Sequence, residues 1–240
     1  MVEFREYQKD IISRGVEIIK KHRFLYLAME VRTGKTLTSL GICDKLDVNK
    51  VLFITKKKAI SSIESDYLNF YPDFKLYVIN YESIHKVDQA GWDVIICDEA
   101  HGMGAFPKPS GRAKKVKDLV DNCNPYVILL SGTPTPEAYS QMYHQVYFIP
   151  NNPFSRYKSF YKFSKDYIRV IQKKIGGLYI NDYSKGSEKI LYDMAPYTIQ
   201  FSQKDAGFIV DTKENVLEVD IKDSTRKLIS RLKKDLVVEG

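Results

Sequence analysis

The sequence contains a short run of residues that suits phosphate binding. Residues 29–36 read Met-Glu-Val-Arg-Thr-Gly-Lys-Thr, with Gly34, Lys35 and Thr36 at the start of an expected helix. A tight turn at a helix N-terminus directs backbone N–H groups at phosphate oxygens, Lys35 reaches the β- and γ-phosphates, and the Thr36 hydroxyl ligates Mg²⁺. The complete Walker A pattern has a small residue where this chain has Met29. Taken alone, the run leaves an ordinary strand-to-helix turn with a solvated lysine as an equal alternative.

Two adjacent carboxylates follow an apolar run farther along the chain. Residues 94–98 read Val-Ile-Ile-Cys-Asp, so Asp98, Glu99 and His101 come at the end of an expected strand. In a parallel sheet, the neighbouring strand must end at this edge to face the phosphate turn. Asp98 would hold Mg²⁺, and Glu99 would orient or deprotonate the attacking water. For the acids alone a solvated strand cap is favoured, but both elements together predict an ATP and magnesium site with Lys35, Asp98 and Glu99 as catalytic residues.

The elements that must position these residues alternate between short apolar strands and amphipathic helices. This alternation is typical of an α/β fold with a parallel sheet covered by helices on both faces. We expect strands at 24–29, 51–55, 76–80, 94–98, 126–131, 196–202 and 215–221, and helices over 7–21, 35–45, the stretch after 55, 110–122 and a final basic segment capped by Asp223 or Ser224.

The composition changes after Pro150. Residues 151–190 hold nine cations and three anions, an excess that nearly accounts for the net charge of +7 of the whole chain. Their aromatic side chains follow helical spacing at Tyr157, Phe160 and Tyr161, which predicts that most of these rings lie in a core. We therefore expect a main fold over 1–150, a small basic helical insertion over 151–195 and a last part over 196–240.

The overall composition excludes several classes of protein. The 240 residues are 44% hydrophobic and 12% aromatic, which is too apolar for a disordered chain. The longest apolar runs are shorter than the roughly 20 residues that a membrane span needs. Three cysteines without metal-type spacing, and an N-terminus without a secretory signal, predict a cytoplasmic protein. The sequence pI of about 9.0 favours a polyanionic partner.

The order of several motifs resembles that of superfamily 2 helicase motors. These motifs are FREYQ (4–8, Q motif), VLFITKKK (51–58, motif Ia), VINYESI (78–84, motif Ib), DEAH (98–101, motif II) and SGTP (131–134, motif III). The resemblance spans about the whole chain and implies a RecA-like P-loop NTPase lobe in which Gln8 reads the adenine edge. Lys56 stands where motif Ia usually has proline, and Arg32 stands where the phosphate loop often has a small or apolar residue.

The same resemblance implies roles for residues around the nucleotide. It implies an ATP-binding set of Arg5, Gln8, Arg32, Thr33, Gly34, Lys35 and Thr36. It implies that Thr36 and Asp98 hold Mg²⁺. It also implies that His101, Ser131 and Thr133 couple the nucleotide state to the nucleic-acid path. For Arg32 a merely solvated side chain is the favoured alternative.

Later segments resemble the Swi/Snf branch of these motors. The segments are GMGAFPKPSGRAKKVKDL (102–119), SGTPTPEAYSQMYHQVYFIP (131–150) and PYTIQFSQKDAG (196–207). The resemblance implies the N-terminal lobe of a DNA-dependent ATPase, a helicase or translocase that moves on double-stranded DNA. A second lobe, which would supply arginine fingers worth roughly 10³–10⁵ in rate, does not follow before Gly240. We therefore expect nucleotide binding with poor hydrolysis by this chain alone, which is either a fragment or the partner of another lobe.

The resemblance also implies where lobe one contacts nucleic acid. Lys and Arg side chains that neutralise backbone phosphates give binding that is sequence-independent and weakened by salt. The candidate contacts are Thr55, Lys56, Lys57, Tyr81, Arg112 and Lys114. For the lysine run that starts at Lys56, a solvated helix start is the alternative.

Three other functions remain open at this stage. An RNA helicase lobe has the same acidic box and glutamine motif. A non-catalytic module would use the ATP pocket only to switch its binding of nucleic acid or a partner. A small-molecule kinase is a more distant alternative, because Gln8 and the Ser-Gly-Thr-Pro segment would then be accidental.

Overall fold

The computed structural model describes residues 3–208 and 222–235, and the chain divides after Phe208 into two units. The first unit contains the sheet and all elements up to Phe208. In the second unit the structure describes α8 (Asp223–Asp235), the expected final basic helix, in which Asp223 is the first helical residue. The strand expected at 215–221 lies outside the described residues. Within the described ranges, no helix is both long enough and apolar enough to cross a membrane.

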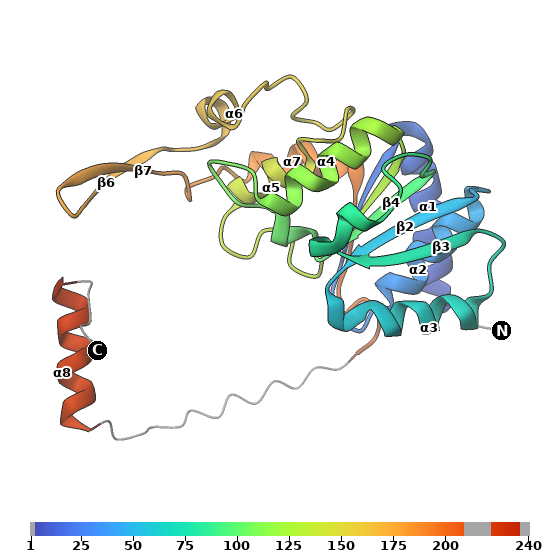
Figure 1. The fold of residues 1–240 in the computed structure, drawn as a ribbon, viewed down its shortest axis with the longest axis horizontal. Helices are drawn as coiled ribbons and strands as arrows, with labels where there is room; N and C mark the ends of the chain where they lie inside the picture. The colour runs from blue at the N-terminus through green and yellow to red at the C-terminus, as the bar shows by residue number, and fades with distance from the viewer. Residues whose placement is uncertain (1–2, 209–221, 236–240) are drawn as a thin grey trace. The chain divides into compact units, whose positions relative to one another are not determined.

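A six-stranded parallel sheet forms the centre of the first unit (Figure 1). Every neighbouring pair in this sheet is parallel, so all six strands end at the same edge. The predicted parallel α/β fold is therefore confirmed. The spatial order is β3 (Lys75–Asn80), β2 (Lys50–Thr55), β4 (Val94–Asp98), β5 (Tyr126–Leu130), β1 (Phe24–Met29) and β8 (Thr198–Phe201).

Helices cover both faces of the sheet because its strands are apolar on both sides. In β1, Phe24 and Tyr26 enter one hydrophobic cluster, and Leu25 and Leu27 enter the other. The cluster around Leu25 is covered by α1 (Glu6–His22), α2 (Lys35–Lys45) and α3 (Ile60–Phe70). The cluster around Phe24 is covered by α4 (Gly111–Cys123) and α5 (Met142–Val146), together with the short turns η2 (Tyr81–Lys86), η3 (Ala100–Met103) and η4 (Tyr139–Gln141).

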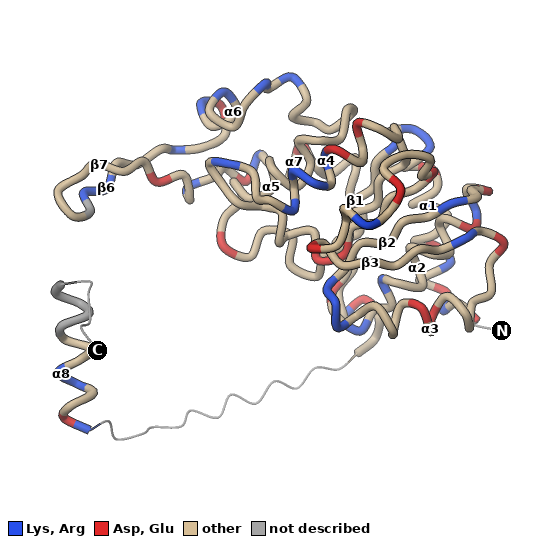
Figure 2. The backbone as a smooth tube through the Cα atoms, viewed as in Figure 1, with Lys and Arg blue, Asp and Glu red and all other residues tan. Residues whose placement is uncertain are grey.

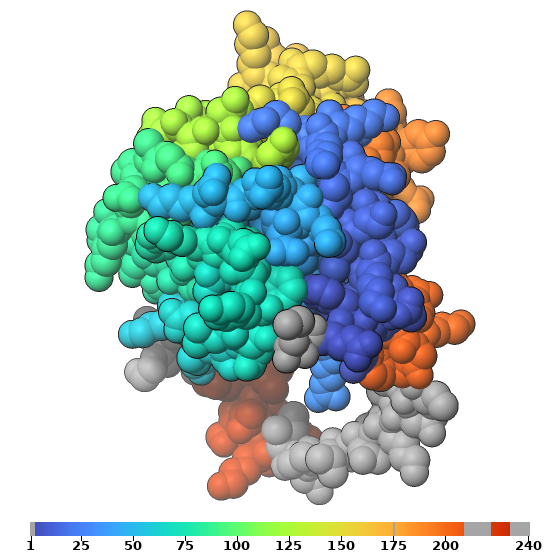
Figure 3. Space-filling model, turned by 90° about the vertical axis from the view of Figure 1, so that its right-hand side faces the viewer, coloured from blue at the N-terminus to red at the C-terminus, as the bar shows by residue number. Residues whose placement is uncertain are grey.

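Residues 151–195, called the protrusion below, differ from the helical insertion that the sequence predicts. They contain α6 (Phe160–Tyr167) and α7 (Lys189–Met194), and between them an antiparallel hairpin of β6 (Ile171–Ile175) and β7 (Leu178–Asp182). The hairpin turns at Gly176 and Gly177, whose φ angles of 57° and 85° suit a two-residue turn. In Figure 1 the hairpin extends away from the sheet, and in Figure 3 the yellow atoms around α6 rise above the remaining surface.

The chain returns to the sheet after the protrusion. The turn η5 (Ala195–Tyr197) leads into β8, which pairs in parallel with β1 so that Tyr26 lies opposite Thr198. The backbone N–H of Glu30 donates to the carbonyl of Phe201, which continues this pairing past the end of β1. The residues that follow β8 are thereby brought to the edge where β1 ends. A connection from here toward a second lobe stays a prediction.

Candidate functional site

The expected phosphate turn and the expected carboxylates meet at the carboxyl edge of the sheet. The turn follows β1, and Asp98 ends β4. The two strands are not neighbours as the sequence analysis assumes, because β5 lies between them. Parallel strands that end at one edge can still place their loops around a common space, and here they enclose a cavity of about 640 Å³. The volume lies within the range of sites for small ligands.

The lining of this cavity combines cations with carboxylates. It contains the loop after β1, the start of α2, the end of β4 and the segment after β5. The residues that line it are Glu30, Val31, Arg32, Lys35, Thr36, Lys56, Asp98, Glu99, His101, Gly132, Thr133 and Gln203. The structure therefore brings together most of the residues expected around the phosphates, and it adds Lys56 and Gln203 to them.

The loop between β1 and α2 contains two residues in the left-handed region of the backbone. Arg32 and Gly34 both have positive φ angles, 64° and 80°. Thr33 is buried, and its hydroxyl donates to the carbonyl of Glu30 at 2.7 Å. The φ angle favours glycine at position 34, and a Cβ atom there would lie 2.6 Å from Nε2 of Gln8 and would displace that side chain. The first N–H groups of α2 are free to face an anion at this position.

Lys35 lies inside this loop rather than in open solvent. Its Nζ donates to the carbonyls of Met29 at 2.8 Å and of Glu30 at 3.0 Å. Burial lowers the pKa of Lys35, and the charges of Asp98, Glu99 and Glu30 oppose this shift. The three carboxylates are thus close enough to Lys35 for their charges to act on it. An ammonium that is already inside the cavity needs only a short movement to bind a phosphate oxygen, a stronger partner than a neutral carbonyl.

Gln8 and its neighbours support the loop from behind and do not line the cavity. Gln8 is buried, accepts at Oε1 from the N–H of Arg5 at 3.0 Å, and donates from Nε2 to the Gly34 carbonyl at 3.4 Å and the Thr38 hydroxyl at 3.3 Å. Tyr7 donates to the Thr33 carbonyl at 3.2 Å. Arg5, Gln8, Thr33 and Gly34 therefore shape the loop, and reading of adenine by Gln8 stays a prediction.

The Asp98 carboxylate is fixed by a neighbouring strand. Thr55, at the end of β2, donates from its hydroxyl to Oδ2 of Asp98 at 2.7 Å. Tyr81 donates to the backbone carbonyl of Asp98 at 2.7 Å. Burial raises the pKa of Asp98, and the hydrogen bond from Thr55 opposes the shift. The bond from Thr55 holds one carboxylate oxygen in place, as a metal ligand needs, and the bond from Tyr81 fixes the backbone that carries it.

Glu99 takes part in a chain of polar contacts that crosses three strand ends. Its φ angle of 51° is left-handed, an uncommon conformation for a residue other than glycine. Oε1 accepts from Lys56 Nζ at 3.1 Å, and Oε2 lies 3.5 Å from His101 Nδ1. The same His101 nitrogen lies 3.0 Å from the Ser131 hydroxyl oxygen, which accepts from the N–H of Thr133 at 3.1 Å. The residues expected to couple the motifs are thus in direct contact.

The donor set at the cavity suits a hard divalent cation. Thr36 supplies a hydroxyl and Asp98 a carboxylate, and both line the same cavity. Oxygen donors of this kind, with water completing the coordination, are what Mg²⁺ prefers next to phosphates. The residues present therefore fit the expected magnesium.

Two of the expected nucleic-acid contacts have other roles in the structure. Thr55 and Tyr81 are buried, with 0% and 2% of their surfaces exposed. Their hydroxyls bind Asp98, so neither side chain is available to a backbone phosphate. The sequence places both residues correctly at strand ends, but it does not show that these hydroxyls point inward.

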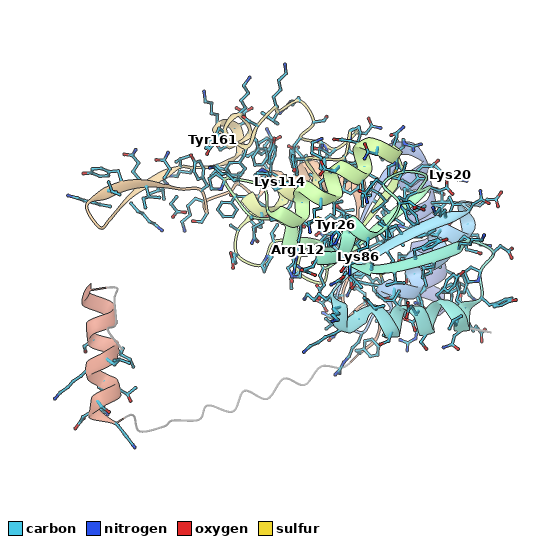
Figure 4. All side chains as sticks on the ribbon, in the orientation of Figure 1. Lys20, Tyr26, Lys86, Arg112, Lys114 and Tyr161 are labelled. Atoms are coloured by element: carbon cyan, nitrogen blue, oxygen red, sulfur yellow. The ribbon has the colours of Figure 1, made fainter. Side chains whose placement is uncertain are left out.

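The remaining expected contacts lie at different places on the surface. Lys57 is exposed in the turn η1 (Lys57–Ala59), and Lys114 is exposed on α4. Arg112, also on α4, donates to Oε1 of Glu82 at 2.7 Å and lies over the Tyr81 ring. Figure 4 shows Arg112 and Lys114 on α4, and Figure 2 shows further cations around α6. Only Lys56 of the expected set lines the cavity.

Sequence reasoning misses the part that Gln203 plays at the cavity. Its N–H donates to Glu30 Oε2 at 2.7 Å, and its Nε2 donates to the Val31 carbonyl at 3.0 Å. Gln203 comes two residues after β8 and more than 170 residues after the loop it binds. Nothing in the local sequence signals this contact, because it depends on β8 pairing beside β1.

Comparison with known protein families gives a match over the first part of the chain. The family described as "Type III restriction enzyme, res subunit" (ResIII) matches residues 1–136. The chain belongs to the ResIII family. Together with the fold, this membership makes it a RecA-like lobe of the superfamily 2 helicase class, as the motif order predicts. No curated protein matches this chain significantly.

A solved structure with a TM-score above 0.5 supports the same fold. The ATPase core of a SWI2/SNF2 protein from Sulfolobus solfataricus, solved in complex with dsDNA, has a TM-score of 0.65 and 17% identity to the ResIII chain. The match covers 100% of this chain but only 55% of that core. The Pyrococcus furiosus Hef helicase domain has a TM-score of 0.49 and 16% identity, with 61% of this chain and 36% of that domain covered.

Proposed function

We propose that the chain is the ATP-binding lobe of a DNA-dependent ATPase, a helicase or double-stranded DNA translocase of the Swi/Snf-like type. One observation carries the proposal. Lys35 from the loop after β1 and the carboxylates of Asp98 and Glu99 after β4 line one cavity, with the N-terminus of α2 at its edge. This is the combination of groups that phosphoryl transfer from a nucleoside triphosphate requires.

The residues around the cavity divide the work by their chemistry. Lys35 and the N–H groups at the start of α2 bind the phosphates. Thr36 and Asp98 would hold Mg²⁺, which neutralises charge on the phosphate oxygens when it is bound. Glu99 orients or deprotonates the attacking water. His101 and Ser131 link Glu99 to the segment after β5, so a change at the nucleotide can move that segment.

Duplex DNA and a second lobe are the partners that complete the proposal. The net charge of +7 and the exposed Lys57 and Lys114 favour a polyanion. The SWI2/SNF2 core of similar fold is described in complex with dsDNA, and this chain spans only 55% of its length. A second RecA-like lobe, in the same or another chain, would supply the arginine fingers that raise the rate. We therefore propose that hydrolysis drives movement on DNA and is slow without that lobe.

Titration with a fluorescent ATP analogue and Mg²⁺ tests the nucleotide site. Lys35→Ala removes a charged hydrogen-bond donor to phosphate, so the Kd should rise about 10- to 100-fold. Lys20→Ala is the matched control, because Lys20 is exposed on α1 and does not line the cavity (Figure 4). Equal affinities of the Lys35→Ala variant and the wild type would refute the proposed site. Faster turnover with duplex DNA than with RNA would support the DNA partner, and the reverse result would favour an RNA helicase.

A further inference from the structure

Lys56 forms an ion pair with the proposed water-activating residue. Its Nζ lies 3.1 Å from Oε1 of Glu99, and the two side chains are 54% and 37% exposed. Lys56 follows β2 directly and begins a run of three exposed lysines that ends at Lys58. The pair therefore joins a lysine run at the surface to a carboxylate that lines the cavity.

The contacts of the Glu99 carboxylate affect its proposed role in activating water. One carboxylate oxygen is held by the Lys56 ammonium and the other lies near His101. A carboxylate oxygen that already accepts from an ammonium has fewer lone pairs left to accept a hydrogen bond from a water. The pair is also half open to solvent, and such ion pairs are weak enough to be replaced by another charged partner. Glu99 is thus restrained by a contact that is easily broken.

A phosphate group is the natural competitor for Lys56. A phosphodiester oxygen accepts a charge-assisted hydrogen bond as a carboxylate does, and a nucleic-acid backbone offers many of them side by side. Lys57 and Lys58 are exposed next to Lys56 and would add to the attraction of a backbone. The terminal phosphate of a nucleotide in the cavity is a second source of the same chemistry, because Lys56 also lines the cavity.

We propose that Lys56 is a latch that restrains Glu99 until a nucleic-acid backbone phosphate binds Lys56 at the end of β2. Loss of the Lys56–Glu99 ion pair frees the carboxylate to activate water. Binding of the polyanion therefore changes the nucleotide site directly. This inference rests on the proposed function and adds a means by which DNA regulates it. Lys56 is then a positioning residue that acts through Glu99, and no bond is made or broken in the step other than the ion pair.

A double-mutant cycle on duplex DNA binding tests the latch. Fluorescence anisotropy with a labelled DNA duplex, without nucleotide and at low salt, compares the wild type, Glu99→Gln, Lys56→Met and the double variant. Glu99→Gln should tighten binding about two- to five-fold, because Lys56 no longer has a competing carboxylate. In the Lys56→Met background the same change should have no effect. Lys58→Met is the matched control, since this nearby exposed lysine should weaken binding but leave the effect of Glu99→Gln intact.

The outcomes separate the latch from its alternatives. An equal effect of Glu99→Gln with and without Lys56 would reflect a general change of charge and would overturn the latch, as would the absence of duplex binding by all four proteins. A loss of nucleotide affinity in Lys56→Met, with no coupling in duplex binding, would assign Lys56 to the nucleotide phosphate instead. The nucleotide titration with Lys35→Ala is independent of these results, so failure of the latch and failure of the proposed function can be told apart.

Turnover gives a second measurement with a different readout. Lys56→Met should raise the rate of hydrolysis without DNA and reduce the factor by which duplex DNA stimulates it. Lys56→Arg, which keeps the positive charge, should retain the stimulation. A lower rate without DNA in Lys56→Met would overturn the latch, because it would make Lys56 a helper of catalysis and not a restraint.

Discussion

The carboxyl edge of the sheet and the protrusion differ in how their side chains are held in place. At the edge, polar side chains from separate strand ends bind one another, as Thr55 binds Asp98 and Lys56 binds Glu99. In the protrusion, the tip of the hairpin leaves large apolar side chains open, with Leu178 71% and Tyr179 70% exposed. The side chains at the edge are held by contacts with one another, whereas the tip is held mainly by the pairing of β6 with β7.

The base of the protrusion, unlike its tip, is held by side-chain contacts with other elements. Phe163 is fully buried, and its ring lies between 4.7 and 6.0 Å from five other aromatic rings. One of these rings belongs to Tyr143 of α5, so the base of the protrusion is packed against a helix that covers the sheet. The protrusion is therefore anchored at its base by an aromatic cluster, and the burial of its large side chains decreases toward the hairpin tip. A two-stranded ribbon without a covered face contributes little stability by itself.

Removal of the Phe163 ring, which anchors the protrusion, should have the largest effect on the free energy of unfolding. Phe163→Ala would leave a cavity among the five rings and should lower the free energy of unfolding by about 3–5 kcal/mol. Because the cluster includes Tyr143 on α5, the protrusion and the sheet should still unfold in one transition. Thermal and urea unfolding followed by circular dichroism and by tyrosine fluorescence would measure both quantities. Two separate transitions would instead mean that the protrusion is an independent unit.

Protonation of His144, which lies where α5 meets the protrusion, should have an intermediate effect on the free energy of unfolding. His144 on α5 stacks on Phe160 of the protrusion, and its Nδ1 lies 2.7 Å from the Ala105 carbonyl oxygen. Burial lowers the pKa of His144 to about 4, with the Ala105 carbonyl opposing the shift. The unfolded chain, with an ordinary histidine pKa near 6.5, then binds the proton more readily than the folded one. Stability should fall from about pH 6.5 toward pH 4, by about 2 kcal/mol at pH 5.

His144→Gln is the control for this pH dependence. Glutamine can donate to the same carbonyl but does not titrate, so its urea unfolding curves should lose most of the decrease between pH 6.5 and pH 5. Parallel pH profiles of the variant and the wild type would show that other groups cause the decrease.

Much of the sheet and of the site could be predicted because both depend on local patterns. The strand at 24–29 and the helix over 35–45 have the predicted bounds, since an apolar run and a glycine turn fix them locally. Lys35 and Asp98 meet in one cavity because strands of a parallel sheet end at one edge, a rule that does not depend on which strand lies between. The order of the strands, by contrast, is set by contacts between distant residues, and the sequence analysis places β4 too close to β1.

The parts that could not be predicted are side-chain directions and one missed turn. Thr55 and Tyr81 lie at the expected strand ends, but their hydroxyls turn inward to Asp98. The hairpin is missed because the lysine-rich and aromatic surroundings suggested a helix, although two glycines between apolar residues are a hairpin signal. Tyr161, which follows the helical spacing of the core, is 50% exposed. Spacing predicts which residues share a face, but it does not decide how much of that face is covered.

Substitution at the hairpin tip should have the smallest effect on stability. Leu178 is 71% exposed, so Leu178→Ser removes almost no buried surface and should change the free energy of unfolding by less than about 0.5 kcal/mol. The same urea unfolding assay that detects Phe163→Ala gives the measurement. A loss of more than about 1 kcal/mol would be too large for so exposed a side chain. It would mean that Leu178 is covered in solution, for example by a second copy of the chain, which a dependence of the unfolding midpoint on protein concentration would reveal.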